Sequence, residues 1–325
     1  MLKTVELAAA DARARGIDLH VKAFDDKEGE SVAAQVAAAI VSDQSVIAVV
    51  GHKNSGPSKA AAPIYAAAGL AQVTQCSTDN SLSRFGWRTF FRMCADNERQ
   101  AAVAAEFAHS RAPRGSAIGI HDSTDYGRPL IEAFAKRFEE VSGRAVRVLG
   151  IQVGQEDFSE IVEVVRAAEP DVIDIGATEI EDGKLMRALR AGGVTALAIG
   201  SEGGPDNPIV RLAGPAGEGM VHTYAGADPT GTPESEALVR RCRAEFGETP
   251  SYMVECYDAV SVIAAAIEKG ASTRAEVRDA IAQTDMQGIA GRIRFDEHGD
   301  RIAAPVSLWT IRDGEMVPLE GAARP

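Results

Sequence analysis

Residues 46–69, VIAVVGHKNSGPSKAAAPIYAAAG, decide the fold of this chain. They run from a short apolar segment through a loop that contains Gly51 into a segment with apolar residues at helical spacing. A continuous apolar run such as VIAVVG is typical of a strand in a parallel sheet that is covered on both faces. The stretch therefore predicts one βα unit, with its loop at the carboxyl end of the strand.

The same rhythm repeats on both sides of this unit and restarts after TFFRMC (89–94). Expected strands are Asp18–Phe24, Ser45–Val50, Ser116–His121, Arg147–Gln152, Val172–Ala177 and Ala196–Gly200, with the later pair GRIRF and APVSLWTIRDG. Expected helices are Ser31–Ser42, Pro57–Ala68, Asn97–Ser110, Arg128–Ser142, Phe158–Ala168, Gly183–Ala191, Pro233–Phe246, Tyr252–Lys269 and Arg274–Thr284. This alternation predicts an α/β protein with open, doubly wound parallel sheets.

Length and charge limit the classes of function that this chain could have. A chain of 325 residues is long enough for two lobes, each with its own apolar core. Its net charge of −13 argues against nucleic acid or an anionic membrane as a partner. The four cysteines lack metal-ligand spacing, so we expect buried thiols. The longest apolar stretch, Val260–Ile267, is too short to span a bilayer, and the N-terminus lacks the pattern of a secretory signal.

Polar residues follow the first two apolar strands. Ser55 and Pro57 stand where the helix after VIAVV should begin, with Ser55 expected as its N-cap, and free N–H groups there would bind a carboxylate. Ser55 alone is more often simply a helix cap. Cys76, Ser77 and Thr78 follow the next strand, and such loops are usually solvated turns. The two loops gain weight as an anion site because neighbouring strands would bring them together.

The second half of the chain repeats this arrangement. Tyr126, Thr178 and Glu202 each follow an expected strand, at its carboxyl end. Glu202 lies between Gly200 and Gly203, where the backbone can approach a ligand closely and the carboxylate could pair with an ammonium group. A solvated turn carboxylate is the alternative interpretation of Glu202.

Four motifs in this order resemble the type I periplasmic binding proteins for branched-chain amino acids, along essentially the whole chain. They are GH-x-x-S at Gly51, His52 and Ser55; Ser77 and Thr78; HD-x-x-x-YG at His121, Asp122, Tyr126 and Gly127; and G-x-EG at Gly200, Glu202 and Gly203. The resemblance implies two Rossmann-like lobes joined by three hinge crossings, near Asp96, Gly226 and Ala303. The expected lobes are residues 1–96 with 226–303, and 97–225 with 304–325.

The resemblance also implies residue roles. Ser55 and Thr78 would bind a ligand carboxylate, aided by the Ser77 loop. The Cys76 carbonyl and the Glu202 carboxylate would bind an ammonium group. Tyr126 would close from the opposite lobe, and Tyr252 would line the pocket for the ligand side chain. No cofactor or metal is implied.

Three departures from the family pattern bear on the ligand. By this resemblance the chain starts inside the family's first helix, so we expect a truncated or misassigned start that leaves strand edges unpaired. Thr178 stands where branched-chain binders often carry an aromatic residue, which favours a different or more polar ligand. Asn54, Gly56 and Pro57 replace a loop richer in hydrogen-bond donors.

The leading hypothesis is a solute-binding receptor of an ABC importer, which the family resemblance places in the periplasm. It would close on an amino acid or small carboxylate between its lobes and dock on a membrane permease. The alternative is a cytoplasmic amide or amino-acid sensor of the same fold that controls a regulatory partner. An enzyme is not expected, because the chain lacks P-loop, GxGxxG, GxSxG and HExxH motifs. His121 beside Asp122 is the only tempting pair, and adjacent strand residues point to opposite faces.

Overall fold

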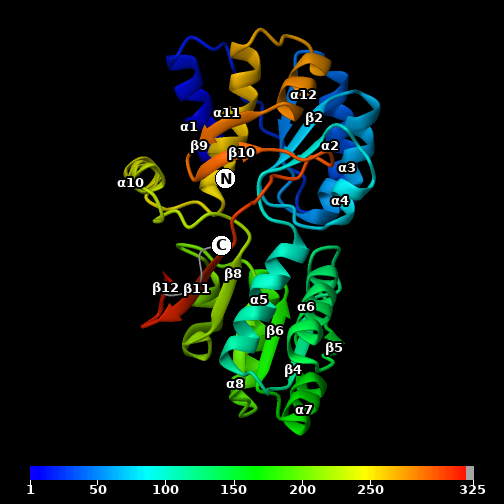
Figure 1. Ribbon diagram of the computed structural model, residues 1–325, viewed down its shortest axis with the longest axis vertical. Helices are drawn as coiled ribbons and strands as arrows, with labels where there is room; N and C mark the ends of the chain where they lie inside the picture. Colours follow the sequence, from blue (N-terminus) through cyan, green and yellow to red (C-terminus); the bar gives the residue numbers. More distant parts are fainter. Residues whose placement is uncertain (320–325) are drawn as a thin grey trace. The chain divides into compact units, whose positions relative to one another are not determined.

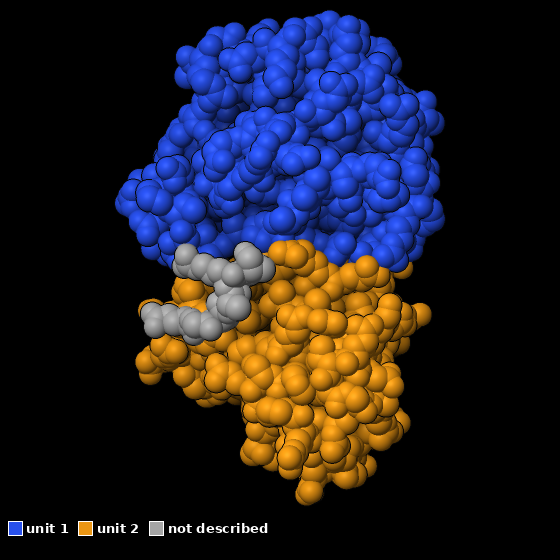
Figure 2. All heavy atoms as spheres, in the orientation of Figure 1, with its two compact units in different colours: residues 1–96, 226–305 blue, residues 97–225, 306–325 orange. Residues whose placement is uncertain are grey.

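The computed structural model describes residues 1–319, which form two compact α/β units. Unit 1 comprises residues 1–96 and 226–305, and unit 2 comprises residues 97–225 and 306–325 (Figures 1 and 2). The chain thus passes between the units three times, after Asp96, after Ala225 and after Pro305. The last passage was predicted two residues earlier, at Ala303.

Unit 1 is built on a parallel sheet of three strands in the order β1-β2-β3. The strands are β1 (Ala48–Val50), β2 (Ala71–Thr74) and β3 (Phe90–Arg92), and β9 (Asp285–Gly288) pairs with β10 (Gly291–Arg294) in a separate antiparallel hairpin. The helices are α1 (Leu2–Ala14), α2 (Glu30–Ser42), α3 (Ser55–Ala67), α4 (Ser81–Arg84), α10 (Pro233–Phe246), α11 (Met253–Glu268) and α12 (Arg274–Ala282).

The sheet of unit 1 carries an apolar core on each side. Val73 and Phe91 pack with Val262 and Ile263 of α11 on one side. On the other side, Tyr65 of α3 is the largest member of a cluster that it forms with α2 residues. Two covered faces explain why the strand of the opening stretch is apolar at every position.

The expected strand Asp18–Phe24 is absent. The chain is extended there, but no backbone hydrogen bond joins this segment to another strand within the described residues. Strand β1 pairs with β2 on one edge only, and its residues are only partly buried. An extended segment with no adjacent partner cannot form a ladder, which is why the apolar pattern of this segment gave the wrong prediction.

Unit 2 is built on a seven-stranded mixed sheet in the order β12-β11-β8-β7-β6-β4-β5. The strands are β4 (Ala117–His121), β5 (Arg147–Gly150), β6 (Val172–Gly176), β7 (Leu197–Gly200), β8 (Val221–Tyr224), β11 (Ser307–Arg312) and β12 (Glu315–Pro318). The helices are α5 (Asn97–Arg111), α6 (Gly127–Ser142), α7 (Ser159–Ala168), α8 (Glu179–Ala191) and α9 (Ile209–Ala213), followed by a short 3₁₀ helix (Gly214–Gly217).

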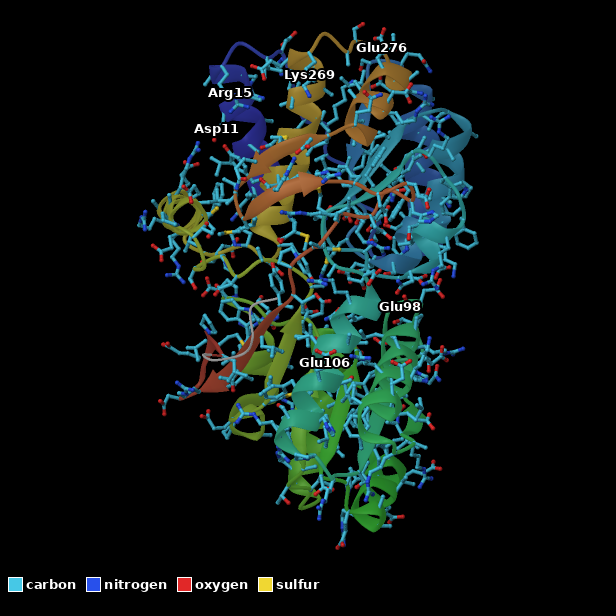
Figure 3. All side chains as sticks on the ribbon, viewed as in Figure 1. Asp11, Arg15, Glu98, Glu106, Lys269 and Glu276 are labelled. Carbon is cyan, nitrogen blue, oxygen red and sulfur yellow. The ribbon has the colours of Figure 1, made fainter. Side chains whose placement is uncertain are left out.

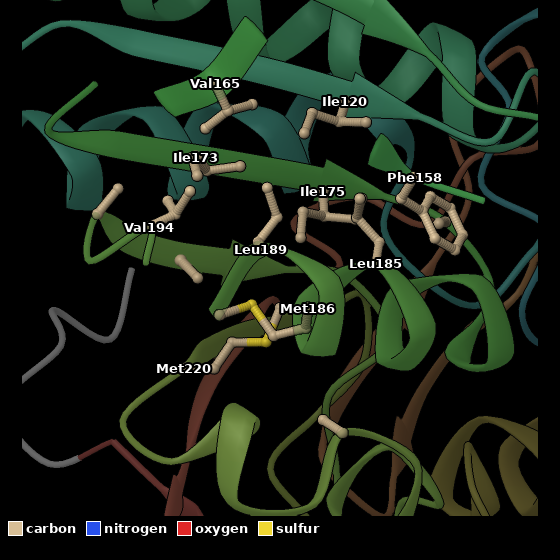
Figure 4. Packing of buried hydrophobic residues seen from close by; sticks show 14 of the residues in the cluster. Ile120, Phe158, Val165, Ile173, Ile175, Leu185, Met186, Leu189, Val194 and Met220 are labelled. Carbon is tan, nitrogen blue, oxygen red and sulfur yellow. The ribbon is translucent and has the colours of Figure 1, made fainter. Parts of the chain in front are cut away.

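Helices cover both faces of this sheet. Ile120, Ile173 and Ile175 pack against Leu185 and Leu189 of α8 (Figure 4). The opposite face packs against α5 and α6, where Phe134 and Phe138 stack with their ring centroids 5.6 Å apart. The sequence prediction of a doubly wound α/β fold is confirmed.

Two sequence predictions need correction beyond Asp18–Phe24. The segments GRIRF and APVSLWTIRDG do not pair with each other: the first pairs with β9 in unit 1, and the second forms β11 between β8 and β12 in unit 2. Strand β8 was not predicted, because its four residues VHTY mix polar and apolar side chains and still lie buried. The four cysteines are buried, as expected.

Candidate functional site

The two polar loops of unit 1 meet at the carboxyl edge of its sheet. Strands β1 and β2 are parallel neighbours with Val50 opposite Val73. The loop after β1 leads to Ser55 at the start of α3, and the loop after β2 holds Cys76, Ser77 and Thr78. The first turn of α3 presents N–H groups that have no intrahelical partner, which is a favourable arrangement for an anion.

Hydrogen bonds tie these two loops together. The Ser77 hydroxyl lies 2.7 Å from Ser58 Oγ and 3.0 Å from the His52 carbonyl. The Asp79 N–H donates to Ser55 Oγ at 3.3 Å. Ser77 therefore fixes the loops through its hydroxyl, and its backbone N–H donates to Thr74 Oγ1 at 3.0 Å.

Ser55 is not the N-cap of α3. Helix α3 begins at Ser55 itself, and Asn54 is the N-cap, without a side-chain capping bond. The Ser55 hydroxyl therefore belongs to the first helical turn, beside the outward N–H groups. This position keeps it in the candidate anion site.

The Thr78 hydroxyl is buried without a hydrogen-bond partner in residues 1–319. A buried hydroxyl that makes no hydrogen bond costs free energy. It is therefore the strongest single sign of a ligand contact in unit 1.

Arg92 is a residue that the sequence analysis missed. Its side chain is fully buried and donates to the Asp79 carbonyl at 2.9 Å, to Ser83 Oγ at 3.1 Å and to the Ser77 carbonyl at 3.4 Å. Asp300 balances its charge, with Nη2 and Oδ1 2.7 Å apart. The charged arginine inside the apolar strand TFFRMC was the available signal, because buried arginines need several partners.

Cys76 and Tyr252 are both buried in unit 1. The Cys76 N–H donates to Thr74 Oγ1 at 3.3 Å, which orients the backbone of this loop. Tyr252 precedes α11 with a positive φ of 52°, which is uncommon for a residue with a side chain. Their proposed ligand contacts remain predictions.

The three candidate residues of unit 2 follow three neighbouring strands. Tyr126 follows β4, Thr178 follows β6 and Glu202 follows β7, and β4, β6 and β7 are consecutive parallel strands. Their loops consequently share one carboxyl edge of the sheet, as the sequence analysis expected.

Asp122 links two of these loops. Its Oδ1 accepts from the Thr124 hydroxyl at 2.5 Å, and its Oδ2 accepts from the Thr178 N–H at 3.1 Å. The Thr178 hydroxyl in turn donates to Glu181 Oε2 at 2.5 Å. The N–H and the hydroxyl of Thr178 are therefore both hydrogen-bonded within unit 2. These bonds give no support to its proposed contact with a ligand.

His121 has a structural role in the same loop. Its Nδ1 accepts from the Ser123 N–H at 3.0 Å, and burial followed by the charge of Arg128 lowers its pKa. Asp122 bonds Thr124 and Thr178 instead of the imidazole. The adjacent pair is thus built into loop structure.

Glu202 is partly buried and has a positive φ of 63°. Its carbonyl accepts a hydrogen bond from Asn207 Nδ2, and Asn207 Oδ1 accepts from the Ile209 N–H at 2.8 Å. A side chain at positive φ requires a surrounding structure that holds it there.

A groove of about 680 Å³ lies elsewhere in unit 1. Its walls are the extended segment 18–26 and residues 45–53, so it follows the open edge of β1. Ser55, Cys76, Ser77 and Thr78 do not line it. The groove is therefore distinct from the candidate anion site.

Within residues 1–319, no three His, Cys, Asp or Glu side chains are grouped so that they could hold a metal ion. No helix in the same residues has the length and apolar character needed to cross a membrane.

Comparisons with known proteins assign the family. A model of the family described as "Periplasmic binding protein" matches residues 1–315. A Leu/Ile/Val-binding protein homolog 2 from Brucella abortus is 30% identical over 322 residues, which cover 96% of this chain and 85% of the relative. A leucine-, isoleucine-, valine-, threonine- and alanine-binding protein from Pseudomonas aeruginosa is 29% identical over 88% of this chain and 76% of the relative.

A solved structure agrees. A leucine-binding protein from Thermotoga maritima superimposes with a TM-score of 0.88 and 25% identity, covering 98% of this chain and 93% of that one. The chain belongs to the periplasmic binding protein family. It is a binding protein and not an enzyme, and its fold is that of the type I members.

Proposed function

We propose that this protein is the solute-binding component of an ABC importer, and that it binds an amino acid or a related small carboxylate. It would act in the periplasm and deliver its ligand to a membrane permease. The proposal is supported by the names of the relatives from Brucella abortus, Pseudomonas aeruginosa and Thermotoga maritima, all of which refer to leucine binding.

The observation that supports the proposal is the arrangement of donors in the candidate anion site of unit 1. The start of α3 at Ser55 offers N–H groups beside the buried, unpartnered Thr78 hydroxyl. Both are donors, and a carboxylate accepts several hydrogen bonds at once. Every amino acid carries this group, so the site suits the class without selecting one member.

Glu202 supplies the opposite charge in our proposal. Its carboxylate would contact the α-ammonium group of the ligand, with the Cys76 carbonyl as a further acceptor. Tyr126 and Tyr252 are proposed contacts for the remainder of the ligand. The engaged hydroxyls of Ser77 and Thr178 make these two residues organisers of their loops first.

The test is calorimetric titration of the protein with leucine, isoleucine, valine, threonine, alanine and benzoate. We expect an amino acid to bind, and Glu202→Gln to weaken it by at least tenfold, because a hydrogen bond to a charged group contributes about 1.5–3 kcal/mol. Asp206→Asn is the matched control, since it removes an exposed carboxylate from the same loop. Cooperative unfolding with no binding of any of these compounds would reject the proposal.

A further inference from the structure

His222 is a fully buried histidine of β8 that no part of the proposed function uses. Its Nδ1 lies 3.1 Å from the carbonyl oxygen of Ser201, the residue before Glu202. A carbonyl can only accept, so the proton of this hydrogen bond is on Nδ1. Burial lowers the pKa of His222 to about 4, which keeps the imidazole neutral at physiological pH.

The contact of His222 with Asp182 is not an ion pair. Asp182 Oδ2 lies 4.0 Å from His222 Nδ1, and both side chains are buried. Burial, and then the nearby charge of Asp174, raises the pKa of Asp182 well above its usual value. Two neutral groups therefore face each other, and the Ser201 carbonyl is the directional partner of the imidazole.

The imidazole also shapes the loop sterically. A Cβ on Gly200 would lie 2.6 Å from the His222 ring and 2.7 Å from Asp182 Oδ2, and a Cβ on Gly203 would lie 3.0 Å from His222 Cβ. The backbone on both sides of Glu202 thus packs directly on His222. This close packing requires both glycines of the G-x-EG motif.

Strand β8 holds the same loop at two more points. The Gly203 N–H donates to the Thr223 carbonyl at 2.8 Å, and the Thr223 hydroxyl lies 3.4 Å from the Gly200 carbonyl. Gln100 fixes that hydroxyl from α5 at 2.9 Å. Among these contacts from β8, the His222 bond is the one that reaches Ser201, whose own hydroxyl donates to the Ala177 carbonyl at 3.3 Å.

We infer that His222 is a positioning residue for ligand binding: its Nδ1–H bond to the Ser201 carbonyl holds Glu202 at positive φ and so directs the Glu202 carboxylate. This inference rests on the proposed function for its effect on affinity. The effect on the loop itself does not depend on any ligand.

Two variants separate the hydrogen bond from the bulk of the ring. In His222→Asn the amide N–H can occupy the place of Nδ1–H, whereas His222→Leu fills similar space without a donor. Should His222→Leu not unfold cooperatively, His222→Val, which suits a strand, replaces it. Both are compared with the wild type by amide hydrogen exchange of residues 201–204 and by calorimetric titration.

Hydrogen exchange gives the ligand-independent answer. We expect residues 201–204 to exchange faster in His222→Leu, by about 5- to 10-fold for one lost hydrogen bond, and to exchange at the wild-type rate in His222→Asn. Unchanged exchange in a folded His222→Leu protein would overturn the inference, whether or not leucine binds.

Titration uses leucine and 4-methylpentanoate, which is leucine without its amino group. Because Glu202 is proposed to contact the ammonium group, His222→Leu should weaken leucine about 5- to 10-fold and leave 4-methylpentanoate unchanged, with recovery in His222→Asn. Equal weakening of both compounds would mean general damage and would reject the positioning role. If the wild type binds another amino acid instead of leucine, that amino acid and its analogue without the amino group replace the two compounds. Failure of the wild type to bind any compound of the panel would count against the proposed function, and hydrogen exchange would still decide the inference.

Discussion

Fully buried Arg92 and partly exposed Asp300 form an ion pair across 208 positions of the sequence, with Nε and Oδ1 2.8 Å apart. The pair joins β3 to the segment that follows the β9–β10 hairpin, and the backbones of the same two residues form a parallel bridge. Because Arg92 also holds the carbonyls of Ser77 and Asp79, its position is transmitted directly to the candidate anion loop.

Removing one partner should show how much this ion pair contributes to the free energy of unfolding. Asp300→Asn leaves the guanidinium of Arg92 buried without its counter-charge. Because Asp300 is partly exposed, we expect a loss of unfolding free energy between about 1 kcal/mol, as for an exposed pair, and about 3–5 kcal/mol, as for a fully buried one. The measurement is denaturant-induced unfolding. The comparison variant is Arg137→Ala, which breaks exposed pairs with Glu106 and Glu140 and should cost less than about 1 kcal/mol. Glu106 of α5 is labelled in Figure 3. Equal losses in the two variants would contradict a special role for Arg92.

Thr78→Val tests the unpartnered hydroxyl. Valine has nearly the same shape as threonine, so the substitution removes a buried group that makes no hydrogen bond in the described chain. We expect the unfolding midpoint without ligand to stay the same or rise, and amino-acid affinity to fall by about tenfold or more. Calorimetry and thermal unfolding on one preparation measure both. A lower midpoint together with unchanged affinity would assign the hydroxyl a structural role instead.

The sequence predicted most of the longer helices and strands, because apolar periodicity reports which faces are covered. It failed at Asp18–Phe24, where the pattern of a strand is present but no neighbouring strand supplies hydrogen bonds. It also missed β8, because His222 and Thr223 are buried polar residues whose partners, Ser201 and Gln100, lie far away in the sequence. Pairing is a property of tertiary structure and cannot be read from one segment.

The candidate site shows the same division. Loop positions at strand ends could be predicted, so Ser55 and Glu202 were identified from the sequence. The sequence could not predict which hydroxyls already make a hydrogen bond within the protein. The Thr178 hydroxyl bonds Glu181, whereas the Thr78 hydroxyl has no partner within residues 1–319. Arg92 was overlooked because its function depends on carbonyl groups, which have no signature in a sequence.

Gly127 of the HD-x-x-x-YG motif should not tolerate a side chain. A Cβ there would lie 2.2 Å from the Gly176 carbonyl oxygen and 2.4 Å from Asp122 Oδ1. Gly127→Ala must therefore shift the start of α6, and with it Tyr126, at a cost of about 1–3 kcal/mol. Gly29→Ala is the control, because its nearest neighbours would lie at 3.8 Å. Denaturant unfolding of both variants makes the comparison, and a neutral Gly127→Ala would refute the close packing of these loops.

Buried acids predict an unusual dependence of stability on pH. Burial raises the pKa of Asp174 to about 8 and that of Glu255 to about 7. Both remain protonated in the folded state while the unfolded chain releases their protons above about pH 4. The folded state therefore binds more protons across this window, and unfolding free energy should fall as pH rises from about 5 to 8.

Asp174→Asn isolates one of these groups, since asparagine resembles the neutral carboxyl and cannot ionise. Between pH 5 and pH 8 the unfolding free energy of the variant should fall less than that of the wild type. The difference reaches about 1.4 kcal/mol for each pH unit over which Asp174 is protonated in the folded wild type and ionised in the unfolded wild type. His222 has the opposite effect on stability. Because its pKa is lowered in the folded state, it reduces the unfolding free energy as pH falls from about 6.5 to 4. Denaturant unfolding at closely spaced pH values measures the slope. Parallel curves for the two proteins would show that Asp174 is ionised in the folded state and would contradict this prediction.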